Sequence, residues 1–272
     1  QIDRSRKMMR TVTKYCFDKN DFPTKYTEFQ KFYLNPKTRR LIPNIELWEE
    51  GQKILEINSL GCKGNEPNLT LPTIGVFGDS TTFCVGNDSW AQRIQIPGTQ
   101  VINAGIEGAN LDMVTERYHE LAQSIKFTAI VVYTGWHNII YNQRTEEYWS
   151  RKLDEFKGDH LLIFCTLATS LHEDCREKGI QSHLNADIKI QSYLDLIKTC
   201  NHEKYYLFWG NLEPSHENIC KILDGVHRYN QFLKNYCIKN NYLLLDFHTL
   251  LKPLSYHFLC KDFFDVCHFR PK

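Results

Sequence analysis

From residue 73 onward, short apolar runs alternate with stretches that carry apolar residues at helical spacing. This alternation is the feature that most constrains the fold, because it is typical of a parallel sheet covered by helices on both faces. The runs expected to form strands cover residues 74–77, 100–103, 129–133, 205–209 and 242–246. The pattern therefore predicts an α/β fold, a three-layer sandwich around a central, mainly parallel five-stranded sheet.

Helices are predicted between these strands. Residues 110–125 carry Leu111, Val114 and Tyr118 at helical spacing, and a second helix is expected over residues 218–240. The stretch 160–178 could form a strand or a helix, because it opens with an apolar run that suits a strand and ends in a charged segment. The charged end favours one long helix, so this stretch is predicted to be helical.

The first seventy residues differ from the rest, being basic, aromatic and rich in turn signals. Residues 53–57 alternate apolar and polar side chains as a short strand does, and Gly61 and Gly64 then allow the chain to turn. We therefore expect an N-terminal extension, residues 1–70, packed on a main domain, residues 71–272.

Charge and hydropathy exclude some partners. Lys and Arg number 33 against 32 Asp and Glu, and no basic stripe suited to a nucleic acid is present. No apolar run reaches the ~20 residues of a membrane-spanning helix, and no signal peptide is recognised. The chain begins with Gln1 rather than methionine, which indicates that an upstream segment, such as a signal or an anchor, has been removed. The oligomeric state cannot be predicted from these features.

The ten cysteines are widely spaced, without a C-x-x-C pair. Cys165 lies in an apolar run, which is typical of cysteine used as a small hydrophobic residue. This usage favours reduced thiols and a reducing, cytoplasmic-type compartment.

A serine follows the predicted strand at 74–77. The run Gly78-Asp79-Ser80 leads from this strand into a helix, where backbone N–H groups lack helical partners and the helix dipole favours negative charge. In open α/β sheets, ligands bind at the carboxyl ends of the strands, which is where Ser80 is expected to lie. Ser80 is therefore a candidate nucleophile, although Asp79 and Ser80 taken alone would be more typical of a helix cap.

A candidate activating pair, Asp265-x-x-His268, lies near the end of the chain. The carboxylate can hold one imidazole nitrogen while the other faces the serine as general base. Because Ser80 follows the first strand of the sheet and this pair follows the last, we expect all three at one rim. The turns after the second and third strands offer Gly108, His137 and Asn138 as donors to an oxyanion.

Together these blocks, in this order, resemble the SGNH/GDSL hydrolase family over residues 73–270. Ser80 matches its nucleophile, Gly108 the glycine whose N–H holds the oxyanion, and Asp265 and His268 its terminal base block. The resemblance implies an SGNH/flavodoxin-like fold and deacylation of a small ester or an acylated carbohydrate, through an acyl-enzyme on Ser80. It implies no cofactor and no metal.

The sequence departs from the family pattern at two places. The family has Gly-x-Asn-Asp after the third strand, where this chain reads Gly135-Trp-His137-Asn138. Direct alignment puts His137 at the donor position and a shift of one residue puts Asn138 there; we favour His137. Family members also continue with a helix beyond the base block, whereas this chain ends four residues after His268, which predicts a longer native protein.

Several alternatives stay open. The same site could transfer the acyl group to a glycan, or the chain could be a catalytically weak SGNH-fold binding module. A zinc site formed by His257, Cys260, Cys267 and His268 is disfavoured, because the spacing matches no common zinc finger and zinc would consume the proposed base. The aromatic residues that follow the third strand suit either a sugar platform or the core, and they are Trp136, Tyr141, Tyr148 and Trp149.

Overall fold

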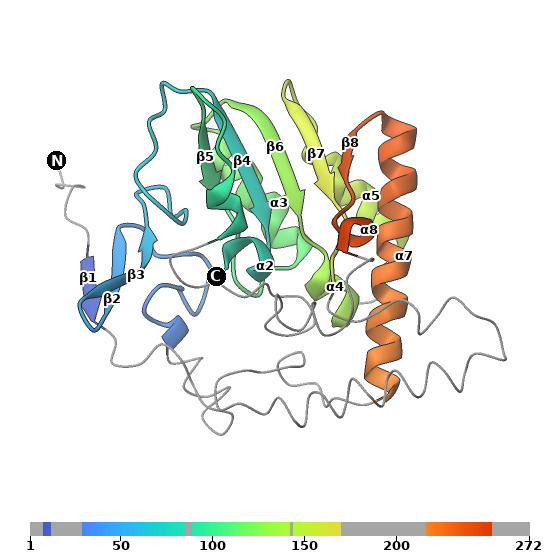
Figure 1. Ribbon diagram of the computed structural model, residues 1–272, viewed down its shortest axis with the longest axis horizontal. Helices are drawn as coiled ribbons and strands as arrows, with labels where there is room; N and C mark the ends of the chain where they lie inside the picture. Colours follow the sequence, from blue (N-terminus) through green and yellow to red (C-terminus); the bar gives the residue numbers. More distant parts are fainter. Residues whose placement is uncertain (1–7, 12–28, 85–88, 142–143, 170–215, 252–272) are drawn as a thin grey trace.

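The computed structural model describes residues 8–11, 29–84, 89–141, 144–169 and 216–251. Its main sheet has the strand order β5-β4-β6-β7-β8, and every pairing in it is parallel. The strands are β4 (Thr73–Gly78), β5 (Gln100–Asn103), β6 (Phe127–Tyr133), β7 (Leu161–Cys165) and β8 (Leu243–Leu245). The α/β fold with a five-stranded parallel sheet, predicted from the sequence, is confirmed (Figure 1).

The prediction for the stretch 160–178 was wrong at its start. Residues 161–165 form β7, which pairs with β6 on one side and with β8 on the other. Phe164 and Cys165 are buried in this position. Two ladders of backbone hydrogen bonds and the burial of the apolar run outweigh the charged residues that follow. The strand expected at 205–209 lies outside the described residues.

Three helices cover one face of the sheet, namely α3 (Leu111–Ala122), α5 (Glu146–Asp154) and α7 (His216–Asn240). Tyr118 of α3 packs edge-on against Phe77 of β4, and Trp149 of α5 packs against Tyr229 of α7. The helices predicted over 110–125 and 218–240 are confirmed as α3 and α7.

The opposite face carries shorter elements. Tyr133 of β6 packs edge-on against Trp90 of the 3-10 helix η1 (Trp90–Arg93) and Phe247 of α8 (Phe247–Leu251). Two further short helices, α2 (Ser80–Phe83) and α4 (Trp136–Ile140), follow the carboxyl ends of β4 and β6 (Figure 1). In the described part of the chain, no helix has the length and apolar character needed to cross a membrane.

A second, smaller sheet precedes the main one. It consists of β1 (Met8–Thr11), β2 (Ile45–Glu49) and β3 (Gln52–Ile57), and Figure 1 shows it to the side of β5. After β3 the chain turns at Gly61 and Gly64, whose φ angles of +68° and +111° favour glycine, as expected. Lys63, between them, pairs with Asn103 of β5. The N-terminal segment is thus joined by backbone hydrogen bonds to the main sheet.

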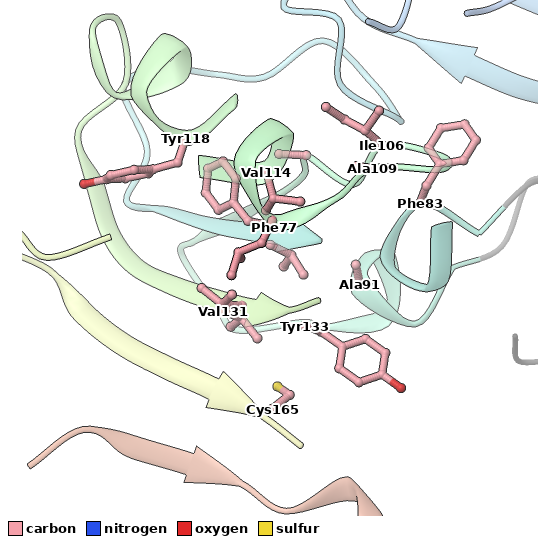
Figure 2. Close-up of a cluster of buried hydrophobic side chains, with 14 of the residues drawn as sticks. Phe77, Phe83, Ala91, Ile106, Ala109, Val114, Tyr118, Val131, Tyr133 and Cys165 are labelled. Carbon is pink, nitrogen blue, oxygen red and sulfur yellow. The ribbon is translucent and has the colours of Figure 1, made fainter. Parts of the chain in front are cut away.

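The hydrophobic core extends to the carboxyl edge of the sheet. Figure 2 shows Phe77, Val114 and Tyr118 in the same buried cluster as Phe83 of α2 and Ile106 of the turn after β5. Cys165, at the end of β7, is buried as expected for a small hydrophobic residue. The short helix α2 is therefore anchored by Phe83, and the residues at its start are held in place by the core beneath them.

Candidate active site

Ser80 is the first residue of α2, directly beyond β4. Asp79 caps this helix, because its Oδ1 accepts hydrogen bonds from the Thr81 N–H at 3.0 Å and from the Thr81 hydroxyl at 2.6 Å. Its Oδ2 accepts the N–H of Gly135 at 3.4 Å, so the buried carboxylate joins α2 to the turn after β6. Ser80 itself is half-buried at this edge. Asp79 therefore holds the start of α2, where Ser80 lies.

Two glycines allow α2 to approach the sheet closely. A Cβ on Gly78 would overlap Thr82 Oγ1 and the carbonyl oxygen of Tyr133, which already form a hydrogen bond of 2.9 Å. A Cβ on Gly105 would lie 2.8 Å from the Cα of Phe83. Gly78, which precedes the Asp-Ser pair, is therefore needed for close packing. The sequence alone does not distinguish this role from that of a glycine in a turn.

Gly108 lies in the turn after β5. The turn is held against β4, since Ala104 donates to the carbonyl of Val76 at 2.8 Å and Ile106 to that of Gly78 at 3.0 Å. Gly108 has a φ of +69°, a backbone conformation that residues other than glycine rarely adopt. The turn therefore brings Gly108 to the same carboxyl edge as Ser80.

His137 and Asn138 are neighbours in α4, and their side chains serve different partners. Asn138 is 1% exposed and its Oδ1 accepts the N–H of Leu111 at 2.9 Å, at the start of α3. His137 is half-buried and interacts electrostatically with Asp79 and Arg39. Asn138 thus supports a helix, while His137 lies near the charged groups of the candidate site.

The surroundings of His137 favour its neutral imidazole. Burial lowers its pKa below the usual 6.5, and the nearby charge of Arg39 acts in the same direction, while Asp79 opposes them. Its Nδ1 is buried and has no hydrogen-bond partner in the described part of the chain. Because a buried N–H without an acceptor is rarer than a buried acceptor without a donor, the proton is favoured on Nε2. In this tautomer, Nε2–H is available to donate a hydrogen bond.

Lys63, from the N-terminal segment, supports the helix that carries Ser80. Its side chain is 4% exposed, and Nζ donates to the carbonyl oxygens of Phe83, at 3.1 Å, and of Cys84. These carbonyls lie at the C-terminal end of α2. Nothing in the sequence around Lys63 indicated this contact, since it joins residues twenty positions apart.

Lys63→Met is expected to lower the free energy of unfolding by about 2–4 kcal/mol, because it leaves two buried carbonyls without a charged donor. Urea denaturation followed by circular dichroism would measure the change. The exposed Lys126→Met serves as control and should stay within about 0.5 kcal/mol of the wild type. Equal stabilities of the two variants would contradict a supporting role for Lys63.

The remaining predicted site residues lie outside the described part of the chain, in the core or partly exposed. Asp265 and His268 lie outside the described residues, as do His257, Cys260 and Cys267 of the zinc alternative. Trp136 and Trp149 have no exposed surface, so they belong to the core and cannot form a sugar platform. Of the other two aromatic residues, Tyr148 is half-buried and Tyr141 is 49% exposed.

Comparison with solved structures gives distant similarities. The chain is similar to a lipolytic protein of the G-D-S-L family from Veillonella parvula, at 15% identity and a TM-score of 0.47, over 73% of this chain and 89% of that one. It is also similar to a lipase/acylhydrolase from Enterococcus faecalis, at 12% identity and a TM-score of 0.43, over 73% of this chain and 87% of that one.

A third similar structure is an acetyl xylan esterase from Geobacillus stearothermophilus, at 14% identity and a TM-score of 0.42, over 67% of this chain and 79% of that one. No protein-family profile and no curated protein sequence matches the chain. The solved structures to which the chain is similar thus include lipolytic G-D-S-L proteins and acetyl xylan esterases.

Proposed function

We propose that this protein is an ester hydrolase of the SGNH/GDSL kind with Ser80 as its nucleophile, acting on a small ester or an acylated carbohydrate. One observation carries the proposal: Ser80 starts a helix at the carboxyl edge of a parallel sheet, beside the turn that contains Gly108 and the turn that leads into α4, the helix of His137. Ligands of such sheets bind at this edge. The buried Asp79 and Lys63 hold the helix at its two ends.

In the first step, Ser80 Oγ attacks the carbonyl carbon of the ester, and His268, oriented by Asp265, accepts the hydroxyl proton. The carbonyl oxygen becomes an oxyanion, which the N–H groups of Ser80 and Gly108 and the His137 side chain stabilise. The bond between the carbonyl carbon and the alcohol oxygen then breaks. His268 returns its proton to the leaving alcohol.

In the second step, water attacks the acyl group on Ser80 while His268 accepts its proton, and the carboxylic acid leaves as the proton returns to Ser80. Transfer to a glycan differs only in that a sugar hydroxyl replaces water. Because His268 must be neutral to accept a proton, activity should fall as the pH is lowered and His268 becomes protonated. A flat profile between about pH 5 and pH 8 would contradict His268 as the base.

Fluorophosphonate labelling tests the nucleophile without knowledge of the substrate. An activated serine oxygen attacks the phosphorus atom, fluoride leaves, and the intact mass rises by one phosphonyl group. The wild type should take up a single label, whereas Ser80→Ala and His268→Ala should take up none under the same conditions. Ser124→Ala, which removes an exposed serine at the end of α3, should label like the wild type.

Folding of each variant is checked by circular dichroism before labelling. Failure of the folded wild type to label would overturn the proposal and favour the binding-module alternative. Labelling of Ser80→Ala to the same extent as the wild type would show that another residue is the nucleophile.

A further inference from the structure

A tight loop of the N-terminal segment presents Arg39. The loop is closed by hydrogen bonds from the N–H of Asn35 to the Arg40 carbonyl and from the N–H of Arg39 to the Asn35 carbonyl, both of 2.8 Å. The Asn35 side chain also accepts the N–H of Lys37 at 2.9 Å and of Thr38 at 3.2 Å. Arg39 has a φ of +56°, which residues other than glycine rarely adopt. Such backbone conformations persist where the surroundings enforce them and occur often at functional sites.

The two arginines of this loop have different partners. Arg40 forms ion pairs with Glu116 at 3.3 Å and Glu120 at 3.1 Å, and so anchors the loop to α3. Arg39 has no carboxylate within ion-pair distance among the described residues, and its Nη2 donates only a long hydrogen bond of 3.4 Å to the carbonyl of Glu107. The half-buried guanidinium of Arg39 thus has no carboxylate partner in this part of the chain.

Arg39 lies next to Gly108, one of the proposed oxyanion donors. Its Nη2 is 2.8 Å from the point where a Cβ on Gly108 would stand, so the missing side chain of Gly108 leaves room for the guanidinium. The charge of Arg39 also affects His137. The positive charge therefore lies beside the position where the carbonyl group of an ester would bind.

We propose that Arg39 binds an anionic group of the substrate, so that the preferred ester carries a carboxylate, sulfate or phosphate close to the scissile bond. This inference rests on the proposed function. An oxyanion accepts about three hydrogen bonds, which Ser80, Gly108 and His137 suffice to donate, so the guanidinium is left for a second group. Its planar, forked donors suit an oxyanion group with two or three oxygen atoms.

Pairs of esters that differ in charge test this inference. On the acyl side, mono(4-nitrophenyl) glutarate is compared with 4-nitrophenyl valerate, which has a methyl group where the glutarate has its carboxylate. On the alcohol side, 4-acetoxybenzoate is compared with 4-methylphenyl acetate. For each pair, kcat/KM of the anionic ester is divided by kcat/KM of the neutral ester, in the wild type and in Arg39→Gln. Comparing the two ratios cancels the difference in intrinsic reactivity between the two esters.

We expect the ratio for one pair to be about 10- to 100-fold higher in the wild type than in Arg39→Gln, as charged hydrogen bonds in a half-buried site typically give. Arg39→Lys should retain part of the preference. High salt should reduce it in the wild type, because salt screens the attraction. Lys37→Gln, the matched control, removes an exposed positive charge from the same loop and should keep the wild-type ratio.

Two outcomes would overturn the inference. Equal ratios in the wild type and Arg39→Gln for both pairs would show that Arg39 binds no anionic group. If kcat/KM also fell equally on charged and neutral esters, Arg39 would only position the Glu107–Gly108 peptide. If Arg39→Gln folds poorly, Arg39→Lys and the salt dependence of the wild type decide the question. Fluorophosphonate labelling of the wild type separates these outcomes from failure of the proposed function, because labelling does not depend on the charge of an ester.

Discussion

Replacing His137 with alanine is expected to lower kcat on a small ester about 10²–10³-fold, the usual loss when one oxyanion donor is removed. The free energy of unfolding should change little, because His137 is half-buried and its Nδ1 forms no hydrogen bond in the described part of the chain. Steady-state kinetics and urea denaturation of the same preparation would measure both quantities. His137→Asn, which introduces the residue type that SGNH/GDSL proteins have as a donor, should recover part of the lost rate.

Asn138→Ala is the matched comparison for this variant. It removes the acceptor for the N–H of Leu111 at the start of α3, so we expect a loss of about 1–3 kcal/mol in stability and little loss in kcat. The opposite pattern, with a large rate loss for Asn138→Ala and none for His137→Ala, would show that the one-residue shift is correct and Asn138 is the donor.

Gly105→Ala is expected to be strongly destabilising. The new Cβ would overlap the backbone nitrogen of Phe83 and lie 2.8 Å from its Cα, and backbone atoms cannot rotate away as a side chain can. Either α2 or the turn after β5 must move, at a cost of about 3 kcal/mol or more. The Tm should fall by roughly 6–12 °C, and fluorophosphonate labelling of Ser80 should slow as α2 shifts.

Gly98→Ala provides the control for this prediction. Gly98 has a φ of +74° but no atom within 4 Å of its would-be Cβ, so alanine there adds backbone strain without overlap. Its cost should stay near about 1 kcal/mol. If both variants lost the same stability, the close approach of Gly105 to α2 would not be the cause.

The sequence predicted the main fold because strands and helices leave local periodic patterns. The apolar runs at 74–77, 100–103 and 129–133 became β4, β5 and β6, and Ser80 follows β4 as predicted. The same local reasoning failed at 161–165, where the charged segment nearby favoured a helix. The strand there exists because β6 and β8 lie on either side of it, and neither neighbour is adjacent in the sequence.

The sequence by itself thus determined the kind of sheet, the place of Ser80 at its edge and the positions of Gly108 and His137 after the next two strands. Only the tertiary structure decided that Asn138 supports α3, that Lys63 holds the end of α2 and that Arg39 lies beside Gly108. The physical reason is the range of the interactions. Periodicity and turn propensity act over a few residues, whereas these three contacts join positions 20 to 69 residues apart and leave no local pattern.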